Sequence, residues 1–167
     1  MHAESLSRML IALALCLCPP PRALQAAEQA DARQKFREEV MTFLKDEGFS
    51  PSMDEEDNRI NFKKEDIHYW IFISEESPFF VTTGRAGFSL QGSDTLDRSR
   101  AMEACNEVNK TKKAVKMYCL EQWVALNIEQ FIHSAEEFKY VFYSNLRVLA
   151  NAYGFFVEKY NNAQNER

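Results

Sequence analysis

Two cysteines, Cys105 and Cys119, lie on either side of an Asn-Lys-Thr glycosylation sequon that begins at Asn109. Such a pair can form a disulfide, bind a metal ion together with other ligands, or pack as two small apolar side chains. The sequence has no HExxH or CxxC pattern, and its histidines, at positions 2, 68 and 133, lie on separate segments. We therefore expect no metal site and no cofactor.

The distance of each cysteine from the corner between helix and strand decides between a disulfide and simple packing. A helix is expected at 93–109 and a strand from about Lys112. Counted from this corner, Cys105 lies about 6 Å up the helix, and Cys119 lies about 23 Å along the strand. Because a disulfide needs Cα atoms within about 7 Å, we expect no disulfide and two buried, reduced thiols at separate levels of one core. The sequon falls on the corner and should be exposed.

No other group of residues has the spacing of a catalytic motif. "GFSLQG" (87–92) is one residue too long for a nucleophile elbow, and "MDEED" (53–57) lacks the alternating ligands and the glycine of a calcium loop. His68 is expected to be a partly buried strand histidine, with a pH switch as the alternative. Because no nucleophile is paired with a base, we expect no catalytic residue and no enzymatic activity.

Residues 1–26 have the pattern of a signal peptide, and 27–167 are expected to form a single α+β domain. The apolar run 9–18 has the length of a signal-peptide core, about half of a membrane span. Small residues at 26 and 27 offer a cleavage site. A lipid anchor at Cys16 or Cys18 is the alternative, although a bulky leucine precedes each cysteine. We expect an exported protein, periplasmic in a bacterium, without a membrane span.

The charge of the chain argues against a nucleic-acid partner. There are 25 acidic and 20 basic residues, which give a net charge of −5, and no basic stripe stands out. Thirteen phenylalanines and only five glycines favour a well-packed globular domain over a disordered chain.

The spacing of apolar residues predicts three helices and five strands. The helices are expected at 27–50, 93–109 and 134–160, and the last of them begins with a Ser134–Glu137 capping box. The strands are expected at 59–63, 66–73, 77–90, 113–120 and 121–131, with a polar connector at 51–58. Short links in the order α-β-β-β-α-β-β-α indicate a two-layer α+β domain with an antiparallel five-stranded sheet.

This element order and the stretch "ACNEVNKTKKAVKMY" (104–118) resemble the YbjN-like family of small bacterial proteins. In that stretch an asparagine-rich helix end leads into a strand of charged and apolar residues. The resemblance covers roughly residues 35–160 and implies a type III secretion chaperone-like fold. It also implies a non-enzymatic role in protein binding, chaperone-like or regulatory, without catalytic residues to carry over. A signal peptide departs from the cytoplasmic secretion chaperones and puts chaperone activity itself in question.

Strand parity places four large aromatic residues on the sheet face away from the helices: Trp70, Phe72, Tyr118 and Trp123. Such a face should be mostly polar. The four rings either cover one another beneath a loop or form a docking surface for another protein or a second copy of the chain. A carrier of a small apolar ligand, held between the helices and the sheet, is the alternative function.

The last helix carries two further features. Asn145 falls in its apolar stripe and is expected to be hydrogen-bonded, because an unbonded buried amide costs on the order of a few kcal/mol. Val148 and Phe155 lie at the edge of the stripe, where they either widen the core contact or touch a partner.

Overall fold

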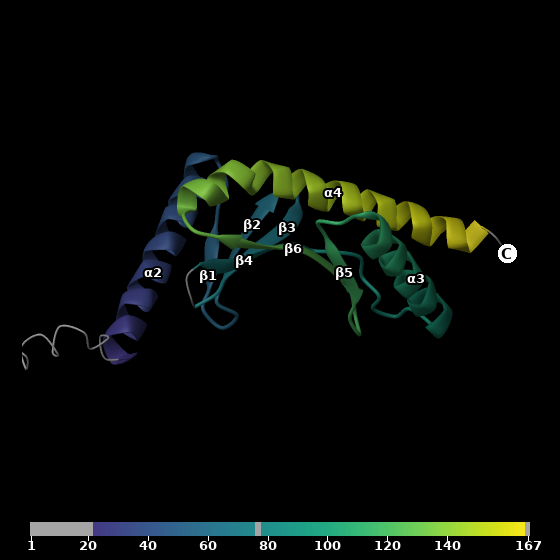
Figure 1. Ribbon diagram of the computed structural model, residues 1–167. Coiled ribbons are helices and arrows are strands. Elements are labelled where there is room, and N and C mark those ends of the chain that lie inside the picture. Colours follow the sequence, from purple (N-terminus) through teal and green to yellow (C-terminus); the bar gives the residue numbers. More distant parts are fainter. Residues whose placement is uncertain (1–21, 76–77, 166–167) are drawn as a thin grey trace, which may run out of the picture.

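An antiparallel sheet of six strands, covered by helices on one face, organises the chain (Figure 1). The computed structural model describes residues 22–75 and 78–165. In chain order the elements are α2 (Arg22–Asp46), β1 (Ser52–Asp54), β2 (Arg59–Lys64), β3 (Ile67–Ile73), β4 (Phe79–Arg85), α3 (Thr95–Thr111), β5 (Lys116–Cys119), β6 (Val124–Ile132) and α4 (Ala135–Asn165). The α+β class and the antiparallel sheet are therefore confirmed.

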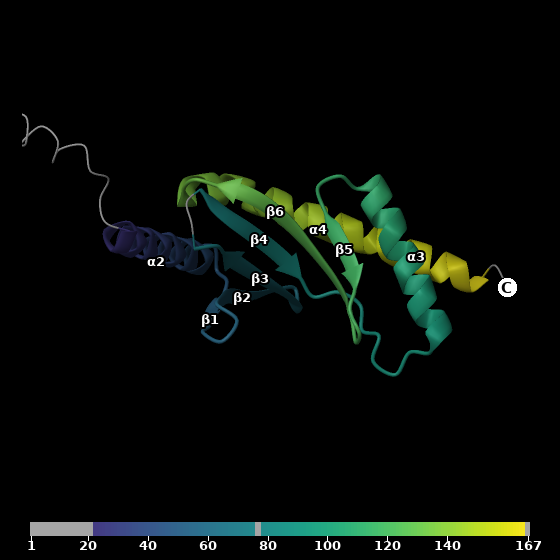
Figure 2. The same ribbon diagram turned by 60° about the horizontal axis from the view of Figure 1, so that its bottom comes forward.

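The strands lie in the order β1-β2-β3-β4-β6-β5, and each strand is antiparallel to its neighbours. The first four strands follow one another directly. Helix α3 then connects β4 to β5, which lies at the far edge of the sheet. Strand β6 follows β5 and lies between β5 and β4 (Figure 2). Strands β3 and β4 therefore lie at the centre of the sheet.

The prediction of five strands is wrong, because the expected polar connector at 51–58 contains β1. Met53 of β1 pairs with Ile60 of β2 and packs against the core. The turn closes through Asn58, which has a φ of 57°, and through the carboxylate of Asp54, which accepts a hydrogen bond from the backbone N–H of Asp57 at 3.2 Å. Three residues are too few to show the alternation by which a strand is found in a sequence.

Helix α4 lies along the covered face of the sheet, with α2 near one of its ends and α3 near the other (Figures 1 and 2). Phe36, Val40 and Leu44 of α2 are buried, as their spacing predicts. Ala32, expected on the same face, is exposed. The Phe142 ring of α4 fills the layer between helices and sheet and contacts five other rings, those of Phe43, Phe49, Phe62, Phe138 and Tyr143.

At the start of α4, Ser134 caps the helix as the capping box predicts, whereas the Glu137 side chain bonds to the residue before Ser134. The backbone N–H of Glu137 donates to the hydroxyl of Ser134 at 3.2 Å. The return bond comes from the backbone N–H of His133, which donates to the Glu137 carboxylate at 2.8 Å and lowers the pKa of that carboxyl. Asn145 is also bonded as expected, since its amide donates to the side-chain oxygen of Gln130 in β6 at 2.8 Å.

No helix in the described part of the chain is long and apolar enough to cross a membrane. Most of the predicted signal peptide, with Cys16 and Cys18, lies outside the described residues. Its last five positions, 22–26, form the first turns of α2.

Candidate interaction surface

The sheet has one face that α4 does not cover, and the alternation along the strands defines it. Gln130 and Arg85 point toward α4, because Gln130 bonds to Asn145 and the Arg85 guanidinium lies 3.8 Å from the centre of the Tyr153 ring. Their sequence neighbours therefore point the other way. We call this surface the helix-free face, and its central residues are Trp70, Phe72, Phe80, Thr82, Gly84, Lys116, Tyr118, Trp123, Ala125, Asn127, Glu129 and Phe131.

The four aromatic residues predicted for this face all lie on it, and three of the face's rings are well exposed. Tyr118 is 40% exposed, Trp123 58% and Phe131 65%. Phe131 was not among the sequence candidates, nor was its neighbour Phe80, whose ring lies 5.3 Å from the Phe131 ring, centre to centre. The odd positions of β6 run on from Trp123 to Phe131, so strand parity alone could have found it.

Trp70 is half-buried, because its own chain supports it from two sides. The indole lies against Gly84, where an added Cβ would approach the Trp70 Cε2 atom to 2.0 Å. The guanidinium of Arg59 lies 5.4 Å from the centre of the indole ring and makes a cation–π contact with it. Phe72, the next residue of β3 on this face, is also half-buried. The aromatic residues are therefore partly covered on β3 and open on β5 and β6.

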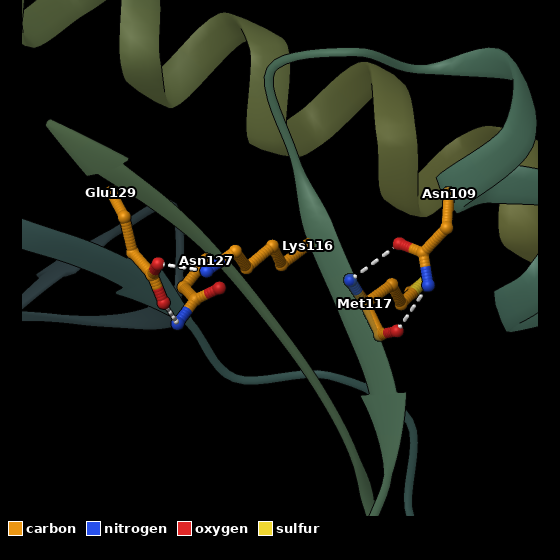
Figure 3. Close-up of polar contacts among 5 residues, drawn as sticks. All are labelled: Asn109, Lys116, Met117, Asn127 and Glu129. Atoms are coloured by element: carbon orange, nitrogen blue, oxygen red, sulfur yellow. Dashed lines mark hydrogen bonds and ion pairs between the residues drawn. The ribbon is translucent and has the colours of Figure 1, made fainter.

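A polar strip crosses the helix-free face between its aromatic ends. Lys116 of β5 forms an ion pair with Glu129 of β6, and the Asn127 amide donates to the same carboxylate at 3.3 Å (Figure 3). Asn127 and Thr82 are buried even though none of the described helices covers them. Trp123, the residue before β6, and Phe131, near the end of β6, thus lie on either side of the paired charges.

The structure does not bring Val148 and Phe155 to this surface. Both belong to α4, on the other layer, and both pack partly buried against the core. The Phe155 ring has the Lys112 ammonium 4.8 Å and the Lys159 ammonium 5.0 Å from its centre. These two residues widen the core contact of α4, one of the two roles expected for them.

The two cysteines lie at the same level, so the expectation of separate levels is wrong. Their Sγ atoms are 3.4 Å apart, and both cysteines are free thiols. Helix α3 ends at Thr111, two residues later than expected, and β5 begins only at Lys116. Counted from these ends, Cys105 lies about 9 Å up the helix and Cys119 about 10 Å along the strand. The four residues between the elements form a loop and add no height.

The sequon asparagine joins the same two elements. The side-chain amide of Asn109 donates to the backbone carbonyl of Met117 at 2.7 Å, and its oxygen accepts from the backbone N–H of Met117 at 2.8 Å (Figure 3). The three sequon residues are exposed, as expected, but they belong to the last turn of α3 and not to the corner after it. Its amide group is engaged by the edge strand.

Other candidates for chemistry stay separate. Among the residues that the structure describes, no group of three or more histidine, cysteine or acidic side chains could hold a metal ion. His68 is exposed on β3, not partly buried as expected. It lies at a surface groove of about 700 Å³ whose lining mixes polar and apolar residues: Gly48, Phe49, Ser50, Ser52, Asn61, Phe62, Lys63 and His68.

Comparison of the chain with known protein families, with curated proteins and with solved structures found no match. The helix-free face is therefore interpreted from its own geometry.

Proposed function

We propose that the protein is a non-enzymatic interaction module whose helix-free face binds protein, and that its first partner is a second copy of itself. The carrying observation is the exposure of Tyr118, Trp123 and Phe131 on a sheet face that no helix covers in the described structure. An uncovered face of an antiparallel sheet is normally polar. Large aromatic residues supply most of the binding energy of protein interfaces.

The spacing along β6 supports a second copy as the partner. Trp123 and Phe131 lie about 26 Å apart, and Asn127 is midway between them. A two-fold axis that crosses the strands at Asn127 places Trp123 of one copy opposite Phe131 of the other, and the reverse contact follows by symmetry. Lys116, the cross-strand partner of Asn127, then lies at the axis opposite its own copy, and Glu129 of the same chain balances its charge. Two sheets can pack face to face in this way, about 10 Å apart.

A carrier of a small apolar ligand receives less support. The layer between helices and sheet, where the ligand would bind, is occupied by contacting rings from both sides, among them Phe36 against Phe79 and Phe62 against Phe142. The groove of about 700 Å³ beside His68 is open at the surface and its lining mixes polar and apolar residues, whereas carriers of apolar ligands have predominantly apolar pockets.

Export to the bacterial periplasm and membership of the YbjN-like family are parts of the same proposal. Export rests on the signal-peptide pattern of residues 1–26, and membership rests on the stretch 104–118 and the order of the elements. Both are compatible with a chaperone-like or regulatory binding role without chemistry of its own.

The test is the oligomeric state of paired variants, measured by sedimentation equilibrium at micromolar concentration. Trp123→Lys and Phe131→Glu should each weaken the dimer tenfold or more, because each removes an aromatic contact twice per dimer. Tyr140→Lys is the matched control, since Tyr140 is 88% exposed but belongs to α4. This control should dimerise like the native chain.

The double variant distinguishes the proposed arrangement from other dimers. In Trp123→Lys/Phe131→Glu, opposite charges face each other across the two-fold axis, so dimerisation should recover relative to either single variant. A dimer that pairs Phe131 with itself would not recover, because like charges would then meet. A native chain that stays monomeric over this concentration range would refute self-association.

A further inference from the structure

Cys105 and Cys119 meet at the contact between α3 and the edge strand β5. Cys105 is only 3% exposed on the inner face of α3, and Cys119 is half-buried as the last residue of β5. Their Sγ atoms are in van der Waals contact at 3.4 Å, about 1.4 Å farther apart than two bonded sulfurs. A small adjustment of the two side chains would bring the sulfurs to bonding distance.

The surrounding contacts hold the two thiols in this position. Asn109, one turn after Cys105 on α3, bonds to both backbone groups of Met117, two residues before Cys119. Ala104 and Val108 are buried beside Cys105 on the same face of α3. The pair is thus presented by two elements with a fixed mutual register, independently of the helix-free face.

We propose that Cys105 and Cys119 form an intramolecular disulfide by exchange with a disulfide-bearing oxidant, and that this bond fastens α3 to the edge of the sheet. The inference does not depend on self-association. It reverses the expectation of permanently reduced thiols, whose basis was a difference in height that the structure does not have.

The exchange has a defined order because the two sulfurs differ in access. The thiolate of Cys119, the more exposed residue, attacks one sulfur of the oxidant and forms a mixed disulfide, while the other oxidant sulfur leaves and takes up a proton. The thiolate of Cys105 then attacks Cys119 Sγ and releases the second oxidant sulfur as a thiol. Two cysteine thiols are oxidised, one oxidant disulfide is reduced to two thiols, and the two protons are transferred to them.

The environment favours a structural bond over a catalytic redox pair. Burial raises the pKa of both thiols. A catalytic cysteine needs a lowered pKa and an electropositive site. Thiols with a raised pKa are also poor leaving groups, so the disulfide, once formed, is reduced slowly.

The test is peptide mapping of the full native chain after incubation with oxidised glutathione. Free thiols are alkylated and the protein is digested with trypsin without reduction. The expected product joins Ala101–Lys110 to Met117–Lys139, because cleavage follows Arg100, Lys110, Lys116 and Lys139. Its mass lies two hydrogens below the sum of the two peptides. It should disappear after reduction and be absent from Cys119→Ser.

Two outcomes would overturn the proposal. The first is recovery of both peptides alkylated while circular dichroism shows the chain folded, which would mean that the folded protein keeps the thiols apart. The second is a cross-link of Cys105 or Cys119 to Cys16 or Cys18, or to another copy of the chain. As a second readout, the thermal midpoint of the native chain should rise on oxidation, whereas that of Cys105→Ser should not change.

Discussion

The replacement of Asn109 by alanine tests the contact between α3 and the edge strand. The side chain makes two hydrogen bonds with the backbone of Met117, at 2.7 and 2.8 Å. Each such bond contributes about 1 kcal/mol net, so their loss costs about 2 kcal/mol. Alanine returns about 0.6 kcal/mol through its higher helix propensity. The free energy of unfolding should therefore fall by about 1.4 kcal/mol.

Asn106 provides the matched control, because it is an exposed asparagine of the same helix. Asn106→Ala gains the same helix propensity without losing the two bonds, so it should be about 0.6 kcal/mol more stable than the native protein. The two variants then differ by about 2 kcal/mol. In a domain of this size that difference corresponds to about 4–8 °C in the thermal midpoint.

Urea denaturation followed by circular dichroism measures the difference, and amide hydrogen exchange locates it. The backbone N–H of Met117 donates to Asn109, so its exchange should accelerate in Asn109→Ala and stay slow in Asn106→Ala. Equal stability of the two variants, or unchanged exchange at Met117, would refute a structural role for the amide.

Two further substitutions test other contacts by urea denaturation. Gly84→Ala places a Cβ 2.0 Å from a Trp70 ring atom and should destabilise the fold by about 1–3 kcal/mol. Its control, Gly154→Ala, meets open space within α4 and should stabilise the fold by about 1 kcal/mol. Equal effects of the two substitutions on the free energy of unfolding would exclude close packing at Gly84. The His133 backbone N–H lowers the pKa of Glu137 below its ordinary 4.5, so this contact stabilises the fold above that pH and is lost as pH falls through the lower folded pKa. Glu137→Gln should therefore be less stable than the native protein at neutral pH and equally stable in strong acid, and a pH-independent difference would contradict the assignment.

Strand parity predicted the helix-free face because it depends on single residues and not on element ends. Trp70 and Tyr118 lie on it as expected. Phe131 was missed although it lies four residues after Asn127 and therefore points to the same face of β6. The sequence could not show which rings stay exposed. Trp70 is half-buried because Gly84, on the neighbouring strand, has no side chain and leaves room for the indole. Nothing in the sequence around Gly84 indicates this contact.

The positions of residues along neighbouring elements, relative to one another, were predicted poorly, because they depend on where each element ends. Cys105 and Cys119, expected at about 6 Å and 23 Å from the corner, are in direct contact because α3 ends two residues later and β5 starts about four residues later than expected. Element ends are set by local bonds that no periodicity reveals. Here the amide of Asn109 holds Met117 and so fixes the helix end against the strand.

The Asn109 amide also decides how the sheet can grow. At one edge it occupies the outward N–H and C=O of Met117, the groups to which a further strand would bind. At the other edge, β1 has only three residues and is followed by the acidic turn residues 55–57. Strand addition is thus discouraged at both edges, while a face-to-face contact closes with two copies. Loss of the amide should open β5 to strand addition and, through it, to fibre growth.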